Sequence, residues 1–501
     1  MVSHSDDLNI APSDGQWNRR SPVDHYRLPV ADHGSSHDAH GQFSWLSARV
    51  HILGIGGTFM GGLALIAREA GHQVSGSDVN IYPPMSTLLG AEDISVHSGY
   101  DPSQWDKAPE LAIIGNALSR GNPLVEHVLS QRIPYTSGPQ WLMEHLLPGR
   151  SMLAVAGTHG KTTTSAMAAF ILDHNGHTPG FLIGGVPGNF PVSARLGAGP
   201  WFVIEADEYD TAFFDKRSKF VHYRPQVLVL GNLEFDHADI FDSISDIEKQ
   251  FEYLLRTVPA QGTIVVNADH PVLETLLERG CWSQIVRYSI CGAETAQWQA
   301  TPHQTDCRHF DVSRHGQHLA TVEWNIIGRH NMANALAAIA ASDAAGVDPV
   351  QACAALAEFR LPQRRLERVN PGDAIALFDD FAHHPTAVRE TLQALRSKNT
   401  PGQLIAVLEL RSNTMKRGVH RDALGKALAL ADVAVVRRRA DLDWDPAELA
   451  LDPDRTTLMV CDTLTQIVDT ISDKAKPGDQ IVMMSNGNFD GLKEMLQAQL
   501  V

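Results

Sequence analysis

The sequence predicts an α/β protein with three domains, each built on a mainly parallel sheet. Three observations support this prediction: short continuous apolar runs recur along the chain, helix-like segments separate most of them, and many runs end in glycine or acidic residues. A length of 501 residues and a hydrophobic content of 43% are enough for several separate cores. We therefore expect functional residues at the carboxyl edges of the strands.

The first α/β segment begins near Arg49. Residues 50–55 form an apolar run, a glycine-rich turn follows at residues 54–61, and a helix is expected through Ala70. Further strands are expected at residues 73–78 and 111–115. The turn resembles a Rossmann phosphate-binding turn, although Phe59 replaces its last glycine. An ordinary strand–helix turn without a ligand is the alternative.

A second glycine-rich turn is more informative. The apolar run at residues 152–156 leads into Gly-Thr-His-Gly-Lys-Thr-Thr-Thr at residues 157–164, and a helix is expected to start there. Backbone N–H groups at such a turn attract phosphate, Lys161 adds a positive charge, and Thr162 offers a hydroxyl to Mg²⁺. Val155 replaces the first glycine of the usual Walker pattern, and an ordinary strand–helix turn is again the alternative. The segment predicts a nucleoside triphosphate site for ATP.

Acidic residues follow two later strands of the same domain, expected at residues 201–205 and 226–230. Residues 204–210 contain four carboxylates, and residues 232–237 contain two more and His237. Carboxylates beside a phosphate loop can hold Mg²⁺. Solvated loop acids are the alternative for each carboxylate, and a structural hydrogen bond is the alternative for His237.

The rest of the middle domain is predicted to contain a strand at residues 262–267 and short antiparallel strands within residues 281–325. An Ala-rich, amphipathic helix is expected from Asn331 to about residue 345. Asn331 either caps this helix or hydrogen-bonds a base.

A third α/β unit begins near Leu361, with strands expected at residues 375–378, 404–408, 457–460 and 480–484. Asp380 follows the first of them and either accepts ribose hydroxyls or caps the helix expected at residues 385–396. The arginine run at residues 437–439 is predicted to be a solvated end of an element.

The composition excludes several classes of protein. A formal charge of −17 argues against a general nucleic-acid binder. The five Cys are scattered and lack a C-x-x-C spacing, so we expect reduced thiols in a cytoplasmic protein, without a metal or disulfide framework. Neither a membrane-spanning apolar stretch nor a secretory signal is recognisable. Residues 1–47 are polar and lack periodicity, so we expect a disordered extension.

Five motifs in order along the chain together resemble the Mur ligase family of cytoplasmic ATP-dependent amide-forming enzymes. They lie at residues 157–164, 205–210, 232–237, 328–334 and 379–385. The resemblance implies an N-terminal Rossmann-like UDP-binding domain, a central P-loop ATPase-type domain and a C-terminal Rossmann-like domain for the amine substrate. The expected boundaries are residues 48–149, 150–361 and 362–501.

The resemblance also implies roles for individual residues. Lys161, Glu205 and His237 are the implied catalytic residues, with Thr162 and Glu205 on one Mg²⁺ and His237 on a second. Asn331 is expected to face adenine, Asp380 the ribose, and either Arg364 or Arg365 the γ-phosphate. The remaining implied ATP contacts are Gly157, Thr158, His159, Gly160 and Thr163. The implied UDP contacts are Gly54, Gly56, Gly57, Met60, Gly61 and Asp78, and the implied peptide contacts are Arg411, Asn413 and Thr414.

Within the family, residues 56–63, 80–87, 114–123 and 409–416 resemble the members that act in peptidoglycan recycling. Those members join UDP-N-acetylmuramate to L-alanyl-γ-D-glutamyl-meso-diaminopimelate through an acyl phosphate. The alternative is the sibling that adds L-alanine in de novo peptidoglycan synthesis, which usually carries a His-Arg-Tyr-Thr-Arg type segment where this chain has residues 410–415. An alternative from another class is an NAD-dependent oxidoreductase, suggested by residues 54–61 and Asp78. We expect two small-molecule partners, UDP-N-acetylmuramate and the tripeptide, and neither nucleic-acid binding nor membrane insertion.

Overall fold

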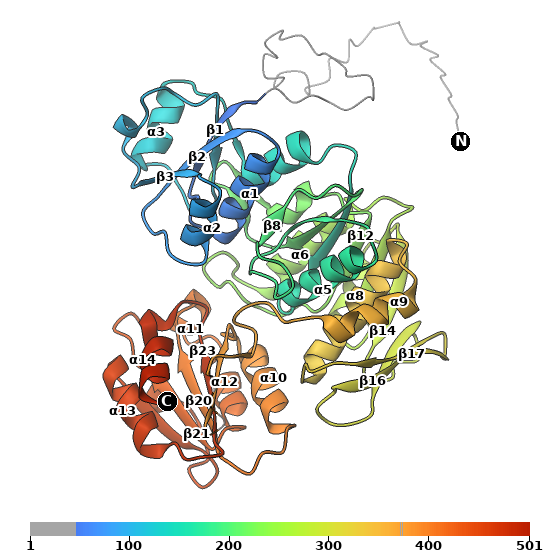
Figure 1. Ribbon diagram of the computed structural model, residues 1–501, viewed down its shortest axis with the longest axis vertical. Helices are drawn as coiled ribbons and strands as arrows, with labels where there is room; N and C mark the ends of the chain where they lie inside the picture. Colours follow the sequence, from blue (N-terminus) through green and yellow to red (C-terminus); the bar gives the residue numbers. More distant parts are fainter. Residues whose placement is uncertain (1–46, 371, 373, 501) are drawn as a thin grey trace, which may run out of the picture. The chain divides into compact units, whose positions relative to one another are not determined.

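The computed structural model describes residues 47–370, 372 and 374–500, which Figure 1 colours along the chain. The predicted extension at residues 1–47 lies outside the described residues, except for its last residue. Three main sheets follow one another along the chain, with helices packed against them (Figure 1). The predicted α/β class with mainly parallel sheets is therefore confirmed. Within the described residues, no helix is long and apolar enough to cross a membrane.

The first sheet is parallel throughout, in the order β3-β2-β1-β4-β5. Its strands are β1 (Arg49–Leu53), β2 (Gln73–Asp78), β3 (Ser95–Ser98), β4 (Leu111–Ile114) and β5 (Tyr135–Ser137). Its helices are α1 (Thr58–Glu69), α2 (Met85–Ala91), α3 (Pro123–Ser130) and α4 (Gly138–Trp141). The strand order reverses between β1 and β4, so the turn after β1 lies at the position where open parallel sheets bind ligands.

The second sheet has the order β17-β16-β15-β14-β13-β12-β6-β9-β7-β8. Its strands are β6 (Ser151–Ala156), β7 (Gly180–Leu182), β8 (Ala194–Arg195), β9 (Trp201–Ala206), β12 (Val227–Leu230), β13 (Thr263–Asn267), β14 (Gln284–Ser289), β15 (Trp298–Pro302), β16 (His309–Arg314) and β17 (Gln317–Glu323). The hairpin β10 (Asp210–Ala212) and β11 (Asp215–Ser218) stands apart from this sheet. The helices of this second domain are α5 (Lys161–His174), α6 (Ile244–Leu255), α7 (Pro271–Glu278), α8 (Arg329–Ala344) and α9 (Pro349–Ala355). Strand β6 lies between β9 and β12 and is parallel to both, which brings their carboxyl ends to one edge.

The prediction of antiparallel strands within residues 281–325 is right for β15, β16 and β17 and wrong for β14. Strand β14 pairs in parallel with β13, because α7 connects them as a crossover helix. This short helix was not predicted from the sequence.

The prediction that α8 is amphipathic is also wrong. Most of its residues from Asn331 to Ser342 are buried, and it contacts α5, α9 and strands β12 to β15. A helix enclosed by other elements has no solvent face and therefore no amphipathic pattern. Its many alanines permit close approach to α5.

The third sheet has the order β18-β19-β23-β20-β21-β22, and only its edge strand β18 is antiparallel. Its strands are β18 (Glu367–Arg368), β19 (Ala376–Asp380), β20 (Leu404–Glu409), β21 (Val433–Arg437), β22 (Thr457–Cys461) and β23 (Gln480–Met484). Its helices are α10 (Pro385–Arg396), α11 (Asn413–Lys416), α12 (Arg421–Leu428), α13 (Leu464–Lys474) and α14 (Leu492–Gln499).

Two sequence interpretations change in this sheet. Arg437 is not simply solvated: its side chain is 17% exposed, and Nη1 donates to the fully buried Glu409 (3.2 Å), so it neutralises a charge inside the fold. Asp380 is not a helix cap, because the cap of α10 is His384, whose ring nitrogen Nδ1 accepts from the Thr386 N–H (3.3 Å).

We predict that Ala338→Leu lowers the free energy of unfolding by about 1–3 kcal/mol, because the fully buried Ala338 leaves no room for a larger side chain. The control Ala344→Leu, near the partly exposed end of the same helix, should cost less than about 1 kcal/mol. Midpoints of urea-induced unfolding measure both changes. Equal midpoints for the two variants would contradict the enclosed position of α8.

Candidate functional site

The phosphate loop lies between β6 and α5, as the sequence predicts. Gly157 (φ 143°) and Gly160 (φ 78°) take backbone conformations that other residues rarely adopt. A Cβ on Gly160 would lie 2.6 Å from the amide oxygen of Asn334, and one on Gly157 would lie 3.0 Å from the carbonyl oxygen of Asn232. Neighbouring segments therefore pack directly on the loop, which makes both glycines obligatory.

Asn232, at the end of β12, fixes this loop and was not assigned a role from sequence. Its Oδ1 accepts from the His159 N–H (2.8 Å), and its Nδ2 donates to the His159 carbonyl (3.2 Å). Both bonds hold the backbone of the loop in place before any ligand arrives. The signals in the sequence were its position after an apolar strand and its place at the start of the motif at residues 232–237.

Lys161 is largely buried, with 12% of its side chain exposed, and it is charged. Its Nζ donates to the Gly157 carbonyl (2.7 Å) and forms an ion pair with Glu208 Oε2 (3.1 Å). Burial opposes the charge, but Glu208, Asp207 and Glu205 outweigh it and raise the pKa of Lys161. The ammonium group is therefore a permanent positive charge at the phosphate loop.

Glu208 joins Lys161 to His237. Its side chain is 3% exposed, and its second oxygen, Oε1, lies 3.0 Å from His237 Nε2. Burial alone would raise its pKa, yet Lys161 and His237 lower that pKa to about 2. Glu208 and Asp236 in turn outweigh burial and raise the pKa of His237. In the sequence, Glu208 is one of four carboxylates without a distinguishing feature, and only the fold shows that it contacts both Lys161 and His237.

Thr162 and Glu205 meet on the other side of Lys161. The Thr162 hydroxyl donates to the Glu205 carboxylate (3.0 Å), and Glu205 Oε2 also accepts from the Gly184 N–H (2.8 Å). A hydroxyl and a carboxylate are oxygen ligands of the kind that Mg²⁺ prefers. Of the three predicted metal ligands, the structure therefore brings Thr162 and Glu205 into contact, while His237 contacts Glu208 instead.

The two adjacent arginines of the interdomain linker diverge. Arg365 Nη2 donates to the Thr162 hydroxyl (3.0 Å), and its guanidinium lies over the Phe381 ring. Arg364 donates to the Ser485 carbonyl (2.7 Å) and pairs with Asp379 (3.3 Å). Only Arg365 therefore reaches the phosphate loop.

Asn331 and Asp380 are both buried and hydrogen-bonded. The N-terminal cap of α8 is Gly328 and not Asn331. The Asn331 side chain instead donates from Nδ2 to the Ile327 carbonyl (2.8 Å). Asp380 accepts from the backbone N–H groups of Leu366 (2.6 Å) and Ala382 (2.7 Å). Their contacts with adenine and ribose stay predictions.

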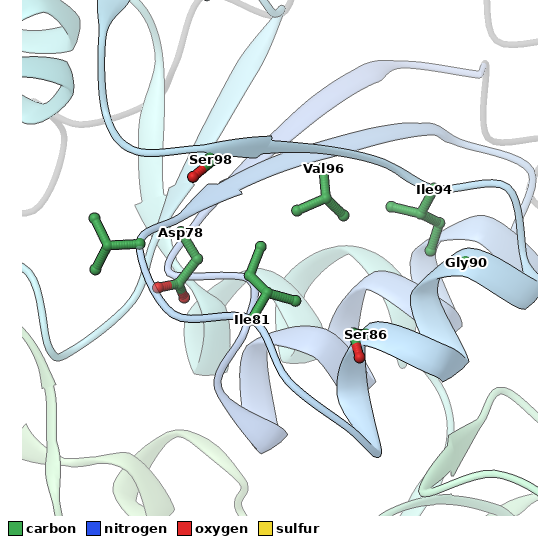
Figure 2. A pocket seen from close by; sticks show the side chains of 8 residues that line it. Asp78, Ile81, Ser86, Gly90, Ile94, Val96 and Ser98 are labelled. Carbon is green, nitrogen blue, oxygen red and sulfur yellow. The ribbon is translucent and has the colours of Figure 1, made fainter.

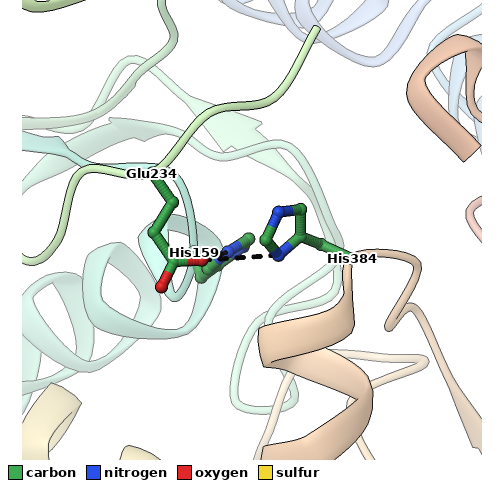
Figure 3. A group of neighbouring side chains, drawn as sticks. All are labelled: His159, Glu234 and His384. Atoms are coloured by element: carbon green, nitrogen blue, oxygen red, sulfur yellow. Dashed lines mark hydrogen bonds and ion pairs between the residues drawn. The ribbon is translucent and has the colours of Figure 1, made fainter. Parts of the chain in front are cut away.

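His159, Glu234 and His384 form a second cluster beside the loop, with ligand-type atoms within 4.8 Å of one another. Figure 3 shows the three side chains together, with the His159 ring drawn between Glu234 and His384 and dashed lines marking the contacts. Glu234 Oε2 lies 3.0 Å from His159 Nε2 and 3.4 Å from His384 Nδ1, and it accepts from the Thr386 hydroxyl (2.7 Å). Burial and the neighbouring His159 lower the pKa of His384 to about 3, so its ring is neutral at pH 7. One carboxylate thus links the phosphate loop to the start of α10.

The turn after β1 is held by Asp78. Its carboxylate accepts from the N–H groups of Gly56 (2.9 Å) and Asn80 (3.1 Å). Gly54 has φ 83°, a Cβ on Gly61 would overlap the Met85 side chain, and Gly57 caps α1. Met60 is buried in the first domain. The predicted UDP residues therefore surround one turn, with Met60 beneath it.

A cavity of about 510 Å³ opens next to this turn. Figure 2 shows its lining side chains, which come from the end of β2, the following loop, α2 and β3. The side chains labelled in Figure 2 are Asp78, Ile81, Ser86, Gly90, Ile94, Val96 and Ser98. A cavity of this size with apolar walls and a few polar groups suits a small ligand.

The predicted peptide residues lie at the carboxyl edge of the third sheet. Arg411 packs on Gly487, since a Cβ on that glycine would meet its guanidinium. Asn413 is exposed, whereas Thr414 is 2% exposed and donates its hydroxyl to Asp236 (2.9 Å). The structure therefore leaves Arg411 and Asn413 at the edge and turns Thr414 toward the middle domain.

Models of known families match each part of the chain. The Mur ligase family catalytic domain matches residues 49–148, the Mur ligase middle domain residues 155–342, and the Mur ligase glutamate ligase domain residues 364–487.

Individual relatives agree over nearly the whole length. The UDP-N-acetylmuramate–L-alanyl-γ-D-glutamyl-meso-2,6-diaminoheptandioate ligase of Haemophilus influenzae is 49% identical over 90% of this chain and 99% of its own. The ligase of the same name from Escherichia coli K12 is 52% identical over 89% of this chain and 97% of its own. The crystal structure of a murein peptide ligase from Psychrobacter arcticus superposes with a TM-score of 0.72 at 43% identity, covering 91% of this chain and 99% of that one. The chain belongs to the Mur ligase family.

Proposed function

We propose that this protein is an ATP-dependent, ADP-forming ligase that joins UDP-N-acetylmuramate to L-alanyl-γ-D-glutamyl-meso-diaminopimelate in peptidoglycan recycling. The observation that carries the proposal is the pairing of Lys161 and His237 with the buried Glu208, beside the Thr162–Glu205 pair. These residues form a charged, ordered site that suits a polyphosphate. The second support is that the protein is 49–52% identical to relatives named for this reaction. The oxidoreductase alternative is wrong, because the chain is a Mur ligase.

A carboxylate does not react with an amine unless it is activated. In the proposed reaction, a carboxylate oxygen of UDP-N-acetylmuramate attacks the γ-phosphorus of ATP, and ADP leaves. The amine of the peptide's L-alanine then attacks the carbonyl carbon of the acyl phosphate. Inorganic phosphate leaves as HPO₄²⁻, which carries away the proton that the amine gives up. The protein mainly has to align three substrates and neutralise charge.

The residues divide these tasks. Lys161 provides a fixed positive charge at the phosphate loop, and Arg365 approaches the same point from the linker. Thr162 and Glu205 would hold one Mg²⁺, and the His237 ring, once its metal-facing nitrogen carries no proton, would hold a second. Bound Mg²⁺ would neutralise phosphate charge. Glu208 keeps Lys161 and His237 in place. The proposed reaction also needs a site that excludes water, because water would hydrolyse an acyl phosphate.

The first domain is the proposed site of the UDP group. The turn from Gly54 to Gly61 offers backbone N–H groups at a helix start for the diphosphate. The cavity beside Asp78 has the size and mixed lining that suit a nucleoside. Asp78 shapes this site by fixing Gly56 and Asn80.

We predict that Lys161→Ala lowers kcat/KM by on the order of 10³-fold, because a buried positive charge at the transferring phosphate is lost. His237 still pairs with Glu208, so the fold should persist. A coupled ADP-release assay measures the rate, and circular dichroism checks the fold. The exposed Lys216→Ala is the control and should behave as wild type. Near-normal turnover by Lys161→Ala would refute the assigned role.

We predict that the tripeptide is preferred to L-alanine by at least about 100-fold in kcat/KM, since a site built for a larger anionic amine leaves polar groups unpaired with alanine. Phosphate release with ATP, UDP-N-acetylmuramate and each amine measures the ratio. A preference for L-alanine would favour the sibling ligase, and activity with neither amine would disprove both.

We predict that Asp78→Ala raises the KM for UDP-N-acetylmuramate by about tenfold, because the turn loses two hydrogen bonds to a charged acceptor. The KM for ATP should stay within about twofold of wild type. Asp101→Ala, which removes a cap of a short helix in the same domain, serves as the control. An unchanged KM for UDP-N-acetylmuramate would show that the turn does not bind this substrate.

A further inference from the structure

The loop of residues 234–238, which carries His237, is held from two sides. On the middle-domain side, the Thr158 hydroxyl accepts from the Glu234 N–H (2.8 Å), and Glu208 contacts His237 (3.0 Å). On the other side, nearly every residue of the loop meets a residue of the third α/β unit. The partners on that side are Thr386, His384, His420, Thr414 and Arg417.

Thr414 makes the most specific of these contacts. Its hydroxyl donates to Asp236 Oδ1 (2.9 Å) and accepts from the Ala238 N–H (3.1 Å). The same oxygen of Asp236 accepts from the His237 N–H (2.7 Å). One hydroxyl therefore ties together the residues on both sides of His237.

This bridge is shielded from water. Thr414 is 2% exposed and Asp236 is 5% exposed, so a carboxylate that lost the hydroxyl would not regain a water molecule easily. His237 has φ 56°, a left-handed conformation that its neighbours have to maintain. The hydroxyl–carboxylate bond is the contact best placed to maintain it.

We propose that Thr414 and Asp236 are positioning residues for His237, so that docking of the third α/β unit completes the metal-holding geometry of the middle domain. This inference rests on the proposed function, because His237 is a proposed Mg²⁺ ligand there. Contacts that orient a metal ligand commonly change metal affinity by about 10–100-fold when they are removed. In this arrangement, the orientation of the His237 side chain depends on whether the third α/β unit, the proposed site of the amine substrate, is docked.

The competing role for Thr414 is a peptide contact, as the family resemblance implies. The buried hydroxyl already uses its single donor and one acceptor position on Asp236 and Ala238. A residue with this hydrogen-bonding pattern is better suited to hold the loop than to bind a peptide. Arg411 and Asn413 then remain as the candidates for peptide recognition.

The experiment uses the full chain with Thr414→Val, which removes the hydroxyl at nearly constant shape, and Thr414→Ser, which retains it. Mn²⁺ binding is followed by electron paramagnetic resonance in the presence of a non-hydrolysable ATP analogue, so that this readout does not depend on turnover. We expect Thr414→Val to weaken Mn²⁺ binding by about tenfold or more and to lower kcat. The KM for the tripeptide should stay within about twofold, and Thr414→Ser should restore both values to within about threefold.

Thr456→Val is the matched control. Thr456 is 1% exposed and donates to the Ala431 carbonyl (2.8 Å) in the same unit, away from the loop, so it tests the loss of a buried hydroxyl alone. It should bind Mn²⁺ as wild type does. The double variant Thr414→Val/Asp236→Ala should bind Mn²⁺ as strongly as the single variant Asp236→Ala does. Each of the two changes breaks the same hydrogen bond, so their effects should not add.

Two outcomes would overturn the inference. Unchanged Mn²⁺ binding in Thr414→Val would show that the bridge does not position His237. A raised KM for the tripeptide with unchanged Mn²⁺ binding would assign Thr414 to the peptide instead. If wild type does not ligate the tripeptide at all, the proposed function fails, while the Mn²⁺ measurements still decide whether Thr414 acts on the metal site.

Discussion

The site depends on the buried carboxylate of Glu208, which Lys161 and His237 share. An ionised group with 3% exposure is stable only when it is paired, and here the two partners come from the loops after β6 and β12. Glu208 itself follows β9, so one acid connects all three strand ends. Removal of either cation would leave the buried carboxylate with a single partner, which explains why these three loops are ordered together.

The sheet order determines which loops can meet in this way. Strand β6 lies between β9 and β12, and all three are parallel, so their carboxyl ends open on one edge. The third sheet repeats this arrangement, with Asp380, Glu409 and Ser485 at or just beyond the ends of its central strands. Crossover connections make such edges the natural place for ligands in α/β proteins. A ligase with three substrates can use one edge for each of them.

Contacts between the second and third units converge on the same few residues. Arg365 donates a hydrogen bond to Thr162, Thr386 donates one to Glu234, and Thr414 donates one to Asp236. Each bond ends on a residue of the phosphate loop or of the loop that carries His237. A reactive acyl phosphate has to be protected from water. The hydrogen bonds that hold the second and third units together also fix the charged side chains, so closure of the site and its ordering are coupled.

The sequence by itself determined the fold class, the three α/β units, the glycine–lysine turn after β6 and the family, because strand–helix alternation and glycine–lysine turns are local patterns. It did not determine that α8 is enclosed, that β14 is parallel, or that Arg437 neutralises Glu409. It also left open which of Arg364 and Arg365 contacts Thr162, and it gave no roles to Asn232 or Glu208. Only the tertiary structure decided these points, since they depend on which side chains from distant segments meet at one sheet edge. Burial then makes their pairing obligatory, and no local pattern in the chain encodes such a meeting.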